Sequence, residues 1–162
     1  MKDKRIEIIV SEIDGIITDG FKPIDYMNHT IFKNYCERDF EAINELKSYF
    51  TFVFLSADKE VSYNIMRNRN IPTYFSENKD LDKMFFLTQR ILPKYKKRPE
   101  NLLYIGNHIS DIPCLQLAER GITLKSSSER VRRASNIILD IEPGHGVISS
   151  LFETLKEDIV NI

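Results

Sequence analysis

The segment from Ser11 to Gly20 carries a dense set of residue types that could do chemistry, and it reads SEIDGIITDG. Glu12 and Asp14 flank one apolar residue directly after a β-branched run, and a glycine and a Thr-Asp-Gly turn follow. Two carboxylates at this spacing can bind a cation or take part in phosphoryl chemistry. An acidic turn at the end of a strand explains the same residues equally well, so this segment alone leaves both interpretations open.

A second candidate is Ser56, which follows a short, nearly all-apolar run and precedes a predicted helix. A hydroxyl between a strand and a helix N-terminus is suited to hold an anion. The same serine can simply cap the helix, and for this residue on its own the capping interpretation is favoured.

Two further polar segments follow apolar runs. The segment KDLDK runs from Lys79 to Lys83, and a lysine there can pair with a phosphate or with a carboxylate nucleophile. The other segment begins at Gly106 and carries Asn107, His108 and Asp111. Polar side chains in a tight loop can complete a cation site. Taken singly, the two segments are better explained as a solvated charge run and a polar turn. The sequence has no His/Cys cluster with zinc spacing.

Strand-like apolar runs alternate with segments of helical spacing along the whole chain. The strands are expected at residues 6–10, 51–55, 73–75, 102–105, 121–124 and 137–139. The helices are expected at residues 39–50, 59–68, 81–92, 112–119, 129–134 and 147–159. Asp39 stands where an N-cap belongs, and residues 21–35 are compatible with a hairpin. This alternation predicts an α/β fold with a mainly parallel sheet covered on both faces, whose reactive groups gather at the carboxyl ends of the strands.

Composition bounds the class of protein. The chain has 162 residues, of which 42% are hydrophobic and 29% charged, so residues 1–162 are expected to form a single globular domain. The formal net charge of -1 argues against a general nucleic-acid binder. The apolar runs are too short for a bilayer, the N-terminus does not look like a signal peptide, and the two cysteines do not suggest a disulfide framework. We therefore expect no membrane partner and a cytoplasmic location.

The order and spacing of the four segments together resemble the haloacid-dehalogenase superfamily over nearly the whole chain. Within it, the chain is similar to the small capless branch that includes 3-deoxy-D-manno-octulosonate 8-phosphate phosphatase and the C-terminal domain of some CMP-sialate synthetases. Residues 12–20 match eight of nine positions of that branch's opening motif in type. The remaining motifs fall on Arg38-Asp39, Ser56, Asp82-Lys83-Met84, residues 106–111 and residues 144–147.

The resemblance implies a Rossmann-like sheet with a β-hairpin after the first motif, no cap domain, and magnesium-dependent phosphomonoester hydrolysis. Glu12 stands at the position of the nucleophile. Asp14 stands at that of the acid/base, which also binds magnesium through its backbone carbonyl. Lys83 and Ser56 would hold the phosphate. The implied phosphate and substrate contacts further include Thr18, Arg38 and Ala57, and the implied metal set is Glu12, Asp14, Asn107 and Asp111.

Departures from the family pattern fall on demanding positions. Glu12 replaces an aspartate, and a misplacement of about 1 Å in such a group can lower a rate roughly 100-fold. Asn107 replaces the chief magnesium carboxylate, and His108 replaces a second aspartate, so two negative charges are gone from the metal loop. Asp58 stands where arginine is common, which puts a negative charge near an incoming phosphate.

Two further departures lie after the hairpin. Phe40 and Ala42 replace glycines in the substrate-facing turn, where we expect them to narrow the approach of a sugar acid. The hairpin itself carries a heavy apolar load, in Phe21, Ile24, Tyr26, Ile31, Phe32 and Tyr35. Because the hairpins of the resembled branch pack against one another, we expect a homotetramer.

Three functional interpretations follow. The favoured one is a catalytically impaired pseudo-phosphatase that serves as a binding or oligomerisation module, with magnesium bound weakly or not at all. The second is an active sugar-acid phosphatase that uses Glu12 and takes a small phosphorylated sugar acid. The third is a regulatory partner of a nucleotide-sugar synthetase. Turnover separates the first two, and co-purification with a synthetase would single out the third.

Overall fold

A central parallel sheet organises the molecule in the computed structural model, which describes residues 5–76 and 82–160. The strands of this described part are β1 (Ile8–Ser11), β2 (Thr51–Ser56), β3 (Thr73–Phe75), β4 (Leu102–Ile105), β5 (Arg120–Leu124) and β6 (Ile137–Leu139). They form a six-stranded sheet in the order β3-β2-β1-β4-β5-β6, with every pairing parallel. The predicted α/β fold with a mainly parallel sheet is confirmed.

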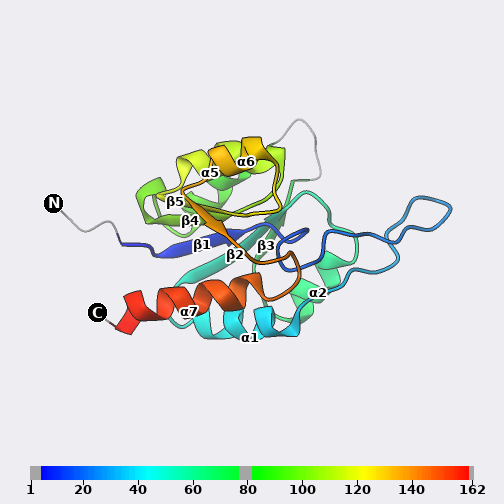
Figure 1. The fold of residues 1–162 in the computed structure, drawn as a ribbon, viewed down its shortest axis with the longest axis horizontal. Coiled ribbons are helices and arrows are strands. Elements are labelled where there is room, and N and C mark those ends of the chain that lie inside the picture. Colours follow the sequence, from blue (N-terminus) through cyan, green and yellow to red (C-terminus); the bar gives the residue numbers. More distant parts are fainter. Residues whose placement is uncertain (1–4, 77–81, 161–162) are drawn as a thin grey trace.

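Helices cover both faces of this sheet (Figure 1). Their bounds are α1 (Glu37–Leu46), α2 (Ser62–Asn68), α3 (Lys83–Phe86), α4 (Leu92–Lys94), α5 (Ile112–Leu117), α6 (Glu129–Arg133) and α7 (Val147–Val160). A π-helical turn at Leu87–Ile91 joins α3 to α4. Helices α1 and α7 lie together below the sheet in the view of Figure 1, and α5 and α6 lie above it.

The apolar runs of the strands feed two separate cores. In β1, Ile9 packs on the side of α1 and α7, whereas Ile8 and Val10 pack on the opposite side. In β2, Phe52 and Phe54 pack on the side of α1 and α7, and Val53 and Leu55 pack on the opposite side. Both faces of a covered parallel sheet are buried, which explains why these strands show no alternation of polar and apolar residues.

Helix α1 begins earlier than its pattern predicted. Its N-cap is Cys36, so Asp39 lies in the first turn and the expectation that Asp39 is the N-cap is wrong. Asp39 is instead fully buried against the start of α7, where its Oδ1 accepts from the Ser149 backbone N–H at 2.9 Å. The helical phase also turns Phe40 and Ala42 into the core. The expectation that these two residues narrow a substrate approach is therefore wrong.

Helix α3 begins with Lys83 and is capped by Asp82, whose side chain accepts from the Phe85 backbone N–H at 2.8 Å. The rest of the predicted charge run, residues 79–81, lies outside the described residues. Lys83, the predicted site lysine, is only 2% exposed and is therefore buried, not solvated as a surface charge run would be.

Residues 19–36, here called the projecting loop, leave the body of the molecule and return to it (Figure 1). The two limbs meet through isolated antiparallel bridges, Thr18↔Tyr35 and Ile24↔Thr30, where a hairpin was predicted from the sequence. The described loop contains no regular strand. The chain therefore turns back on itself as a hairpin does, but without a continuous ladder of backbone hydrogen bonds. Its exposed apolar side chains are Phe21, Ile24, Tyr26, Met27, Ile31 and Phe32.

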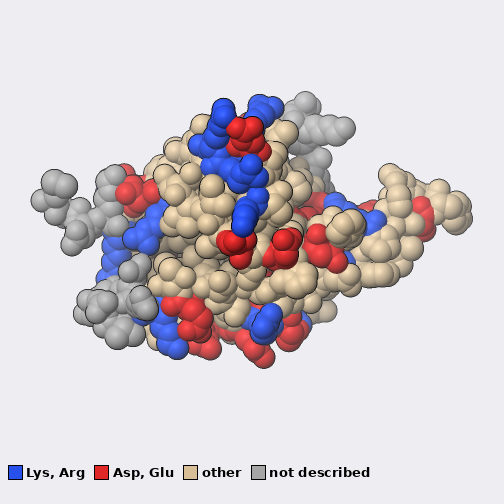
Figure 2. Space-filling view, viewed as in Figure 1, with Lys and Arg blue, Asp and Glu red and all other residues tan. Residues whose placement is uncertain are grey.

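The charged side chains on the face drawn in Figure 2 are distributed unevenly. Lys and Arg gather over α6, which carries Arg130, Arg132 and Arg133, while the outer part of the projecting loop is mostly uncharged. Among the helices of residues 5–76 and 82–160, none has the length and apolar character needed to cross a membrane.

Candidate active site

A cavity of about 480 Å³ opens at the carboxyl ends of β1, β2 and β4. The strand order reverses beside β1, the position where open α/β sheets place their ligand crevice. The cavity is lined by Glu12, Asp14, Gly20, Lys22, Ser56, Ala57, Asp58, Lys83, His108, Ile109 and Ser110. The polar segments predicted from the sequence therefore do meet at one edge of the sheet.

Glu12 lies directly after β1 and is 1% exposed. Its Oε1 accepts from the backbone N–H groups of Ile13 at 2.8 Å and Asp14 at 3.4 Å. Its Oε2 accepts from the Lys83 ammonium. Both oxygens of the predicted nucleophile are thus already engaged.

Lys83 bridges two buried carboxylates. Besides Glu12, its Nζ donates to Asp111 Oδ1 at 2.6 Å, and the same oxygen accepts from the Tyr104 hydroxyl at 2.7 Å. Burial acts to lower the pKa of Lys83, but Glu12 and Asp111 outweigh it and the pKa is raised. We call Glu12, Lys83, Tyr104 and Asp111 the Lys83 cluster, a buried and charged ion network.

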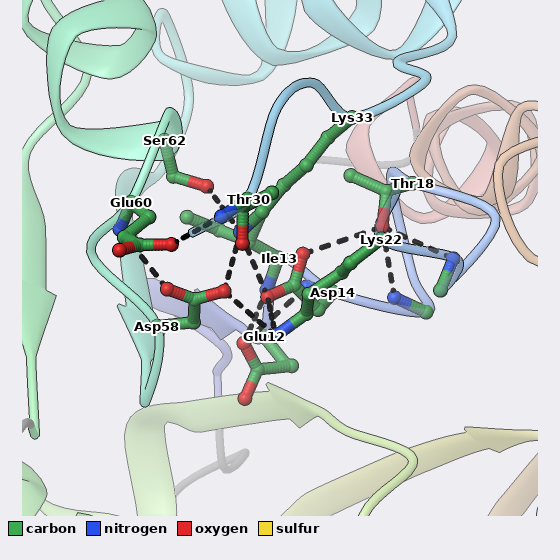
Figure 3. Close-up of polar contacts among 12 residues, drawn as sticks. Glu12, Ile13, Asp14, Thr18, Lys22, Thr30, Lys33, Asp58, Glu60 and Ser62 are labelled. Carbon is green, nitrogen blue, oxygen red and sulfur yellow. Dashed lines mark hydrogen bonds and ion pairs between the residues drawn. The ribbon is translucent and has the colours of Figure 1, made fainter. Parts of the chain in front are cut away.

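A second network of charges surrounds Asp14 (Figure 3). Asp14 Oδ2 lies 3.0 Å from Lys33 Nζ and 3.6 Å from Lys22 Nζ. Asp58 Oδ2 lies 2.6 Å from Lys22 Nζ and 3.2 Å from Lys33 Nζ. Lys33 also donates to Ser62 Oγ at 3.0 Å. These five residues form what we call the Lys33 cluster, and the projecting loop supplies both of its lysines.

The Lys33 cluster changes the expected electrostatics of Asp58. Burial acts to raise the pKa of Asp58, but hydrogen bonding to Lys22 and the charge of Lys33 outweigh it, so the pKa is lowered. The pKa of Lys22 is raised by the same pairing against the opposing effect of burial. The negative charge of Asp58 that the sequence predicts near a phosphate is therefore present, but it is paired with Lys22 and Lys33.

The loop after β4 closes against the loop after β1. His108 Nε2 lies 3.1 Å from the Asp14 carbonyl oxygen, and Asn107 Nδ2 donates to the Gly15 carbonyl at 3.1 Å. The backbone N–H groups of Asn107 and His108 both donate to Asp111 Oδ2, at 3.0 and 2.9 Å. Asp111 thus orients the loop after β4 and is not among the residues that line the cavity.

Magnesium requires near-octahedral oxygen ligands, and proteins usually hold it through one or two carboxylates plus substrate phosphate. Here each carboxylate oxygen of Glu12, Asp14 and Asp111 already accepts from the protein. The Asp14 carbonyl faces His108, and Asn107 Oδ1 is the oxygen of this set that lacks a partner among the described residues. A search of the described residues finds no group of three His, Cys, Asp or Glu side chains able to hold a metal. The implied ligand set does not fit magnesium.

The structure separates the predicted site residues into two groups. Those that line the cavity are Glu12, Asp14, Ser56, Ala57 and Lys83. Ser56 is fully buried there, and its hydroxyl has no partner among the described residues. Thr18 lies behind the cavity and accepts from the backbone N–H groups of Gly15 and Gly20. Arg38 lies apart, with its guanidinium 3.3 Å from the His145 carbonyl, so its substrate role stays a prediction.

Four residues of the two clusters are not predicted from the sequence, namely Ser62, Tyr104, Lys22 and Lys33. The charged ones are Lys22 and Lys33. Both come from the projecting loop, where each is surrounded by apolar and aromatic residues. An isolated lysine in such a loop is usually solvated, and its partners lie far away in the chain. The available signal was Lys33 itself, a charged residue directly after the apolar pair Ile31 and Phe32.

No family model matches the chain. Among curated proteins, a phosphoglycolate phosphatase from Methanopyrus kandleri is 34% identical over 59 residues, which is 36% of this chain. The match spans 25% of the length of that relative.

Solved structures match over far more of the chain. A HAD family hydrolase from Streptomyces avermitilis is 27% identical, with a TM-score of 0.83 over 93% of this chain and 90% of that one. A 3-deoxy-D-manno-octulosonate 8-phosphate phosphatase from Moraxella catarrhalis, solved with magnesium, phosphate and the sugar acid KDO, is 21% identical. Its TM-score is 0.84 over 94% of this chain and 87% of that one. The chain therefore has the fold of the haloacid-dehalogenase superfamily, in the capless form of the 3-deoxy-D-manno-octulosonate 8-phosphate phosphatases.

Proposed function

We propose that this protein is a phosphatase-like protein with strongly reduced turnover, which binds a small phosphorylated sugar acid or a related anion in its cavity. The observation that carries the proposal is the state of Glu12. Its Oε1 accepts from two backbone N–H groups, and its Oε2 is paired with the Lys83 ammonium. A nucleophile has to direct one oxygen at phosphorus, and the extra methylene of glutamate changes where that oxygen lies.

Binding needs donors that face the cavity, and these are retained. The Ser56 hydroxyl is unpartnered within the described residues, and Lys22 and Lys83 also line the cavity. Hydroxyl and ammonium groups are suitable donors for phosphate oxygens. We therefore propose that anion binding survives the loss of normal turnover, with magnesium contributing weakly or not at all. The proposal takes residues 1–162 as one domain that acts in the cytoplasm.

An active phosphomonoesterase is the second candidate function. It is favoured by the open cavity, in which Glu12, Asp14, Ser56 and Lys83 converge. The Moraxella catarrhalis relative, which holds phosphate and KDO, supports a phosphorylated sugar acid as the ligand class for either candidate.

Hydrolysis of p-nitrophenyl phosphate and of a panel of sugar-acid phosphates tests the proposal. The wild type is compared with Glu12→Asp, with Asn107→Asp and with the double variant, each in the presence of magnesium. These groups act on one transition state, so we expect the double variant to regain more turnover than either single change. Rapid magnesium-dependent hydrolysis by the wild type would support the active phosphomonoesterase instead.

We further propose a homotetramer assembled through the projecting loop. Tyr26 is 97% exposed and Phe21 76% exposed, and the loop carries further exposed apolar side chains. Contiguous exposed apolar surface of this kind usually marks an interface. Light scattering should return the tetramer mass for the wild type and a lower mass for the combined variant Phe21→Ser and Tyr26→Ser. A monomer mass for the wild type would contradict the assembly.

A further inference from the structure

Two backbone carbonyls after β1 are covered by side chains from the loop after β4. The Asp14 carbonyl faces His108 Nε2 at 3.1 Å, and the Gly15 carbonyl accepts from Asn107 Nδ2 at the same distance. A carbonyl oxygen only accepts hydrogen bonds, so His108 must carry its proton on Nε2 in this contact. The two carbonyls thus receive N–H donors from the protein, and a cation would have to displace His108 to reach the Asp14 oxygen.

The surrounding backbone is built for this arrangement. A Cβ added at Gly15, whose φ is +75°, would lie 2.1 Å from Asn107 Nδ2. A Cβ added at Gly106 would lie 2.5 Å from Asp111 Cγ. A side chain at Gly15 would be strained by the positive φ and would displace the Asn107 amide, and a side chain at Gly106 would displace Asp111. Asp111 then fixes the loop, because its Oδ2 accepts from the backbone N–H groups of Asn107 and His108.

The positive charge that faces the cavity comes from the protein itself. Lys22 and Lys83 line the cavity together with His108, and the fully buried ammonium of Lys33 lies behind Asp14. Counted over Glu12, Asp14, Asp58 and Asp111, four carboxylates are paired with these three lysines. Each of the four carboxylates thus contacts a lysine of the protein, although the formal negative charges outnumber the positive ones by one.

We infer that His108 and Asn107 replace the divalent cation of this fold, so that the cavity binds a phosphate-class anion without one. The inference deepens the proposed function and rests on it to the extent that the anion occupies the same cavity. His108 is assigned as a donor that takes the cation's place at the Asp14 carbonyl. Asn107 is assigned as an uncharged donor that holds the Gly15 carbonyl by a hydrogen bond.

Calorimetry with inorganic phosphate tests the inference on the unmodified protein. The titration is run once in EDTA and once with excess magnesium. The dissociation constants should agree within about twofold. A tightening of about tenfold or more on adding magnesium would overturn the inference, and so would the absence of phosphate binding under both conditions.

A variant that restores the two missing carboxylates sharpens the test. The double change Asn107→Asp with His108→Asp should bind phosphate at least about tenfold more tightly in magnesium than in EDTA, because ligand charge sets affinity at such sites. Magnesium alone should give a saturable heat with this variant and none with the wild type. His145→Ala is the matched control, since it removes an exposed histidine outside the cavity and should behave like the wild type. Equal magnesium affinity of wild type and double variant would overturn the inference.

Turnover of p-nitrophenyl phosphate, measured on the same wild-type samples, separates this inference from the proposed function. Rapid hydrolysis in EDTA would refute reduced turnover and would support cation independence. Magnesium-dependent phosphate binding with negligible hydrolysis would overturn the cation replacement and would leave the reduced turnover intact.

Discussion

The Lys83 cluster and the Lys33 cluster lie beside each other at the same edge of the sheet, and they are built from different parts of the chain. The Lys83 cluster joins the ends of β1 and β4 to the first residue of α3. The Lys33 cluster joins the loop after β1 and the segment after β2 to the projecting loop. The Lys83 cluster therefore depends on regular strands and a helix, and the Lys33 cluster depends on the irregular projecting loop.

The two clusters also differ in whether each carboxylate has more than one lysine beside it. Lys83 is the ammonium that pairs with both Glu12 and Asp111, and all three side chains are at most 2% exposed. Asp14 and Asp58 share two ammonium groups, Lys33 and the partly exposed Lys22. The comparison teaches that Glu12 depends on one counter-ion with no substitute within the described residues, whereas Asp14 has a second lysine nearby.

Loss of the Lys83 ammonium should give the largest effect on stability. The variant Lys83→Met keeps most of the side-chain volume and leaves two buried carboxylates without their cation. We expect the free energy of unfolding to fall by about 3 to 5 kcal/mol, measured by urea denaturation. The double variant Lys83→Met with Glu12→Gln should recover part of the loss. A loss below about 1 kcal/mol for Lys83→Met would show that this pairing matters little.

The corresponding change in the Lys33 cluster should be milder. Lys33 is fully buried at its ammonium, so Lys33→Met should lower the free energy of unfolding by about 2 to 3 kcal/mol. Lys22 stays near both carboxylates and compensates in part. Lys22→Met, which removes the more exposed partner, is the matched control and should lose less than about 1 kcal/mol. If Lys33→Met were as damaging as Lys83→Met, the contrast between the clusters would fail.

Asp39 provides a third case, because it is a buried carboxylate held mainly by backbone N–H groups. Burial raises its pKa from 3.8 to about 6, against the opposing effect of the N–H groups at the start of α7. A raised carboxyl pKa means that the associated stability is complete below about pH 4 and is lost as the pH rises through 6.

We therefore compare the wild type with Asp39→Asn, which cannot ionise. The free energy of unfolding of the wild type relative to this variant should fall by about 1 to 2 kcal/mol between pH 4 and pH 7. Denaturant unfolding at several pH values within this window measures the difference. A difference that does not change with pH would contradict the raised pKa.

The regular part of the fold was predictable because its signals are local. The apolar runs of β1, β2 and β4 are short and bounded by polar loops, and their carboxyl ends necessarily meet in a parallel sheet. That geometry brings the loops of Glu12 and Asp111 together. Lys83 begins α3 after β3, and its place at the site was implied by the family resemblance and not by local spacing.

The remaining part was not predictable, because it depends on contacts between distant residues. Lys33 meets Ser62 across 29 positions and Asp14 across 19, and no local pattern specifies either contact. The resemblance to a family motif predicts that Phe40 lies in a substrate-facing turn, whereas the phase of α1 places it in the core. The sequence indicates only that His108 replaces an aspartate of the family pattern, because its contact with the Asp14 carbonyl forms between two loops that are distant in the chain.

The central claim is that Glu12 no longer works as an efficient nucleophile, and one measurement tests it most directly. Release of p-nitrophenol from p-nitrophenyl phosphate is followed with magnesium for the wild type and for Glu12→Gln, which removes the carboxylate charge while keeping the side-chain length. The account predicts that the two rates agree within about threefold. A wild-type rate about 100-fold or more above that of Glu12→Gln would contradict it, because such a difference is the size expected when a positioned catalytic group is lost.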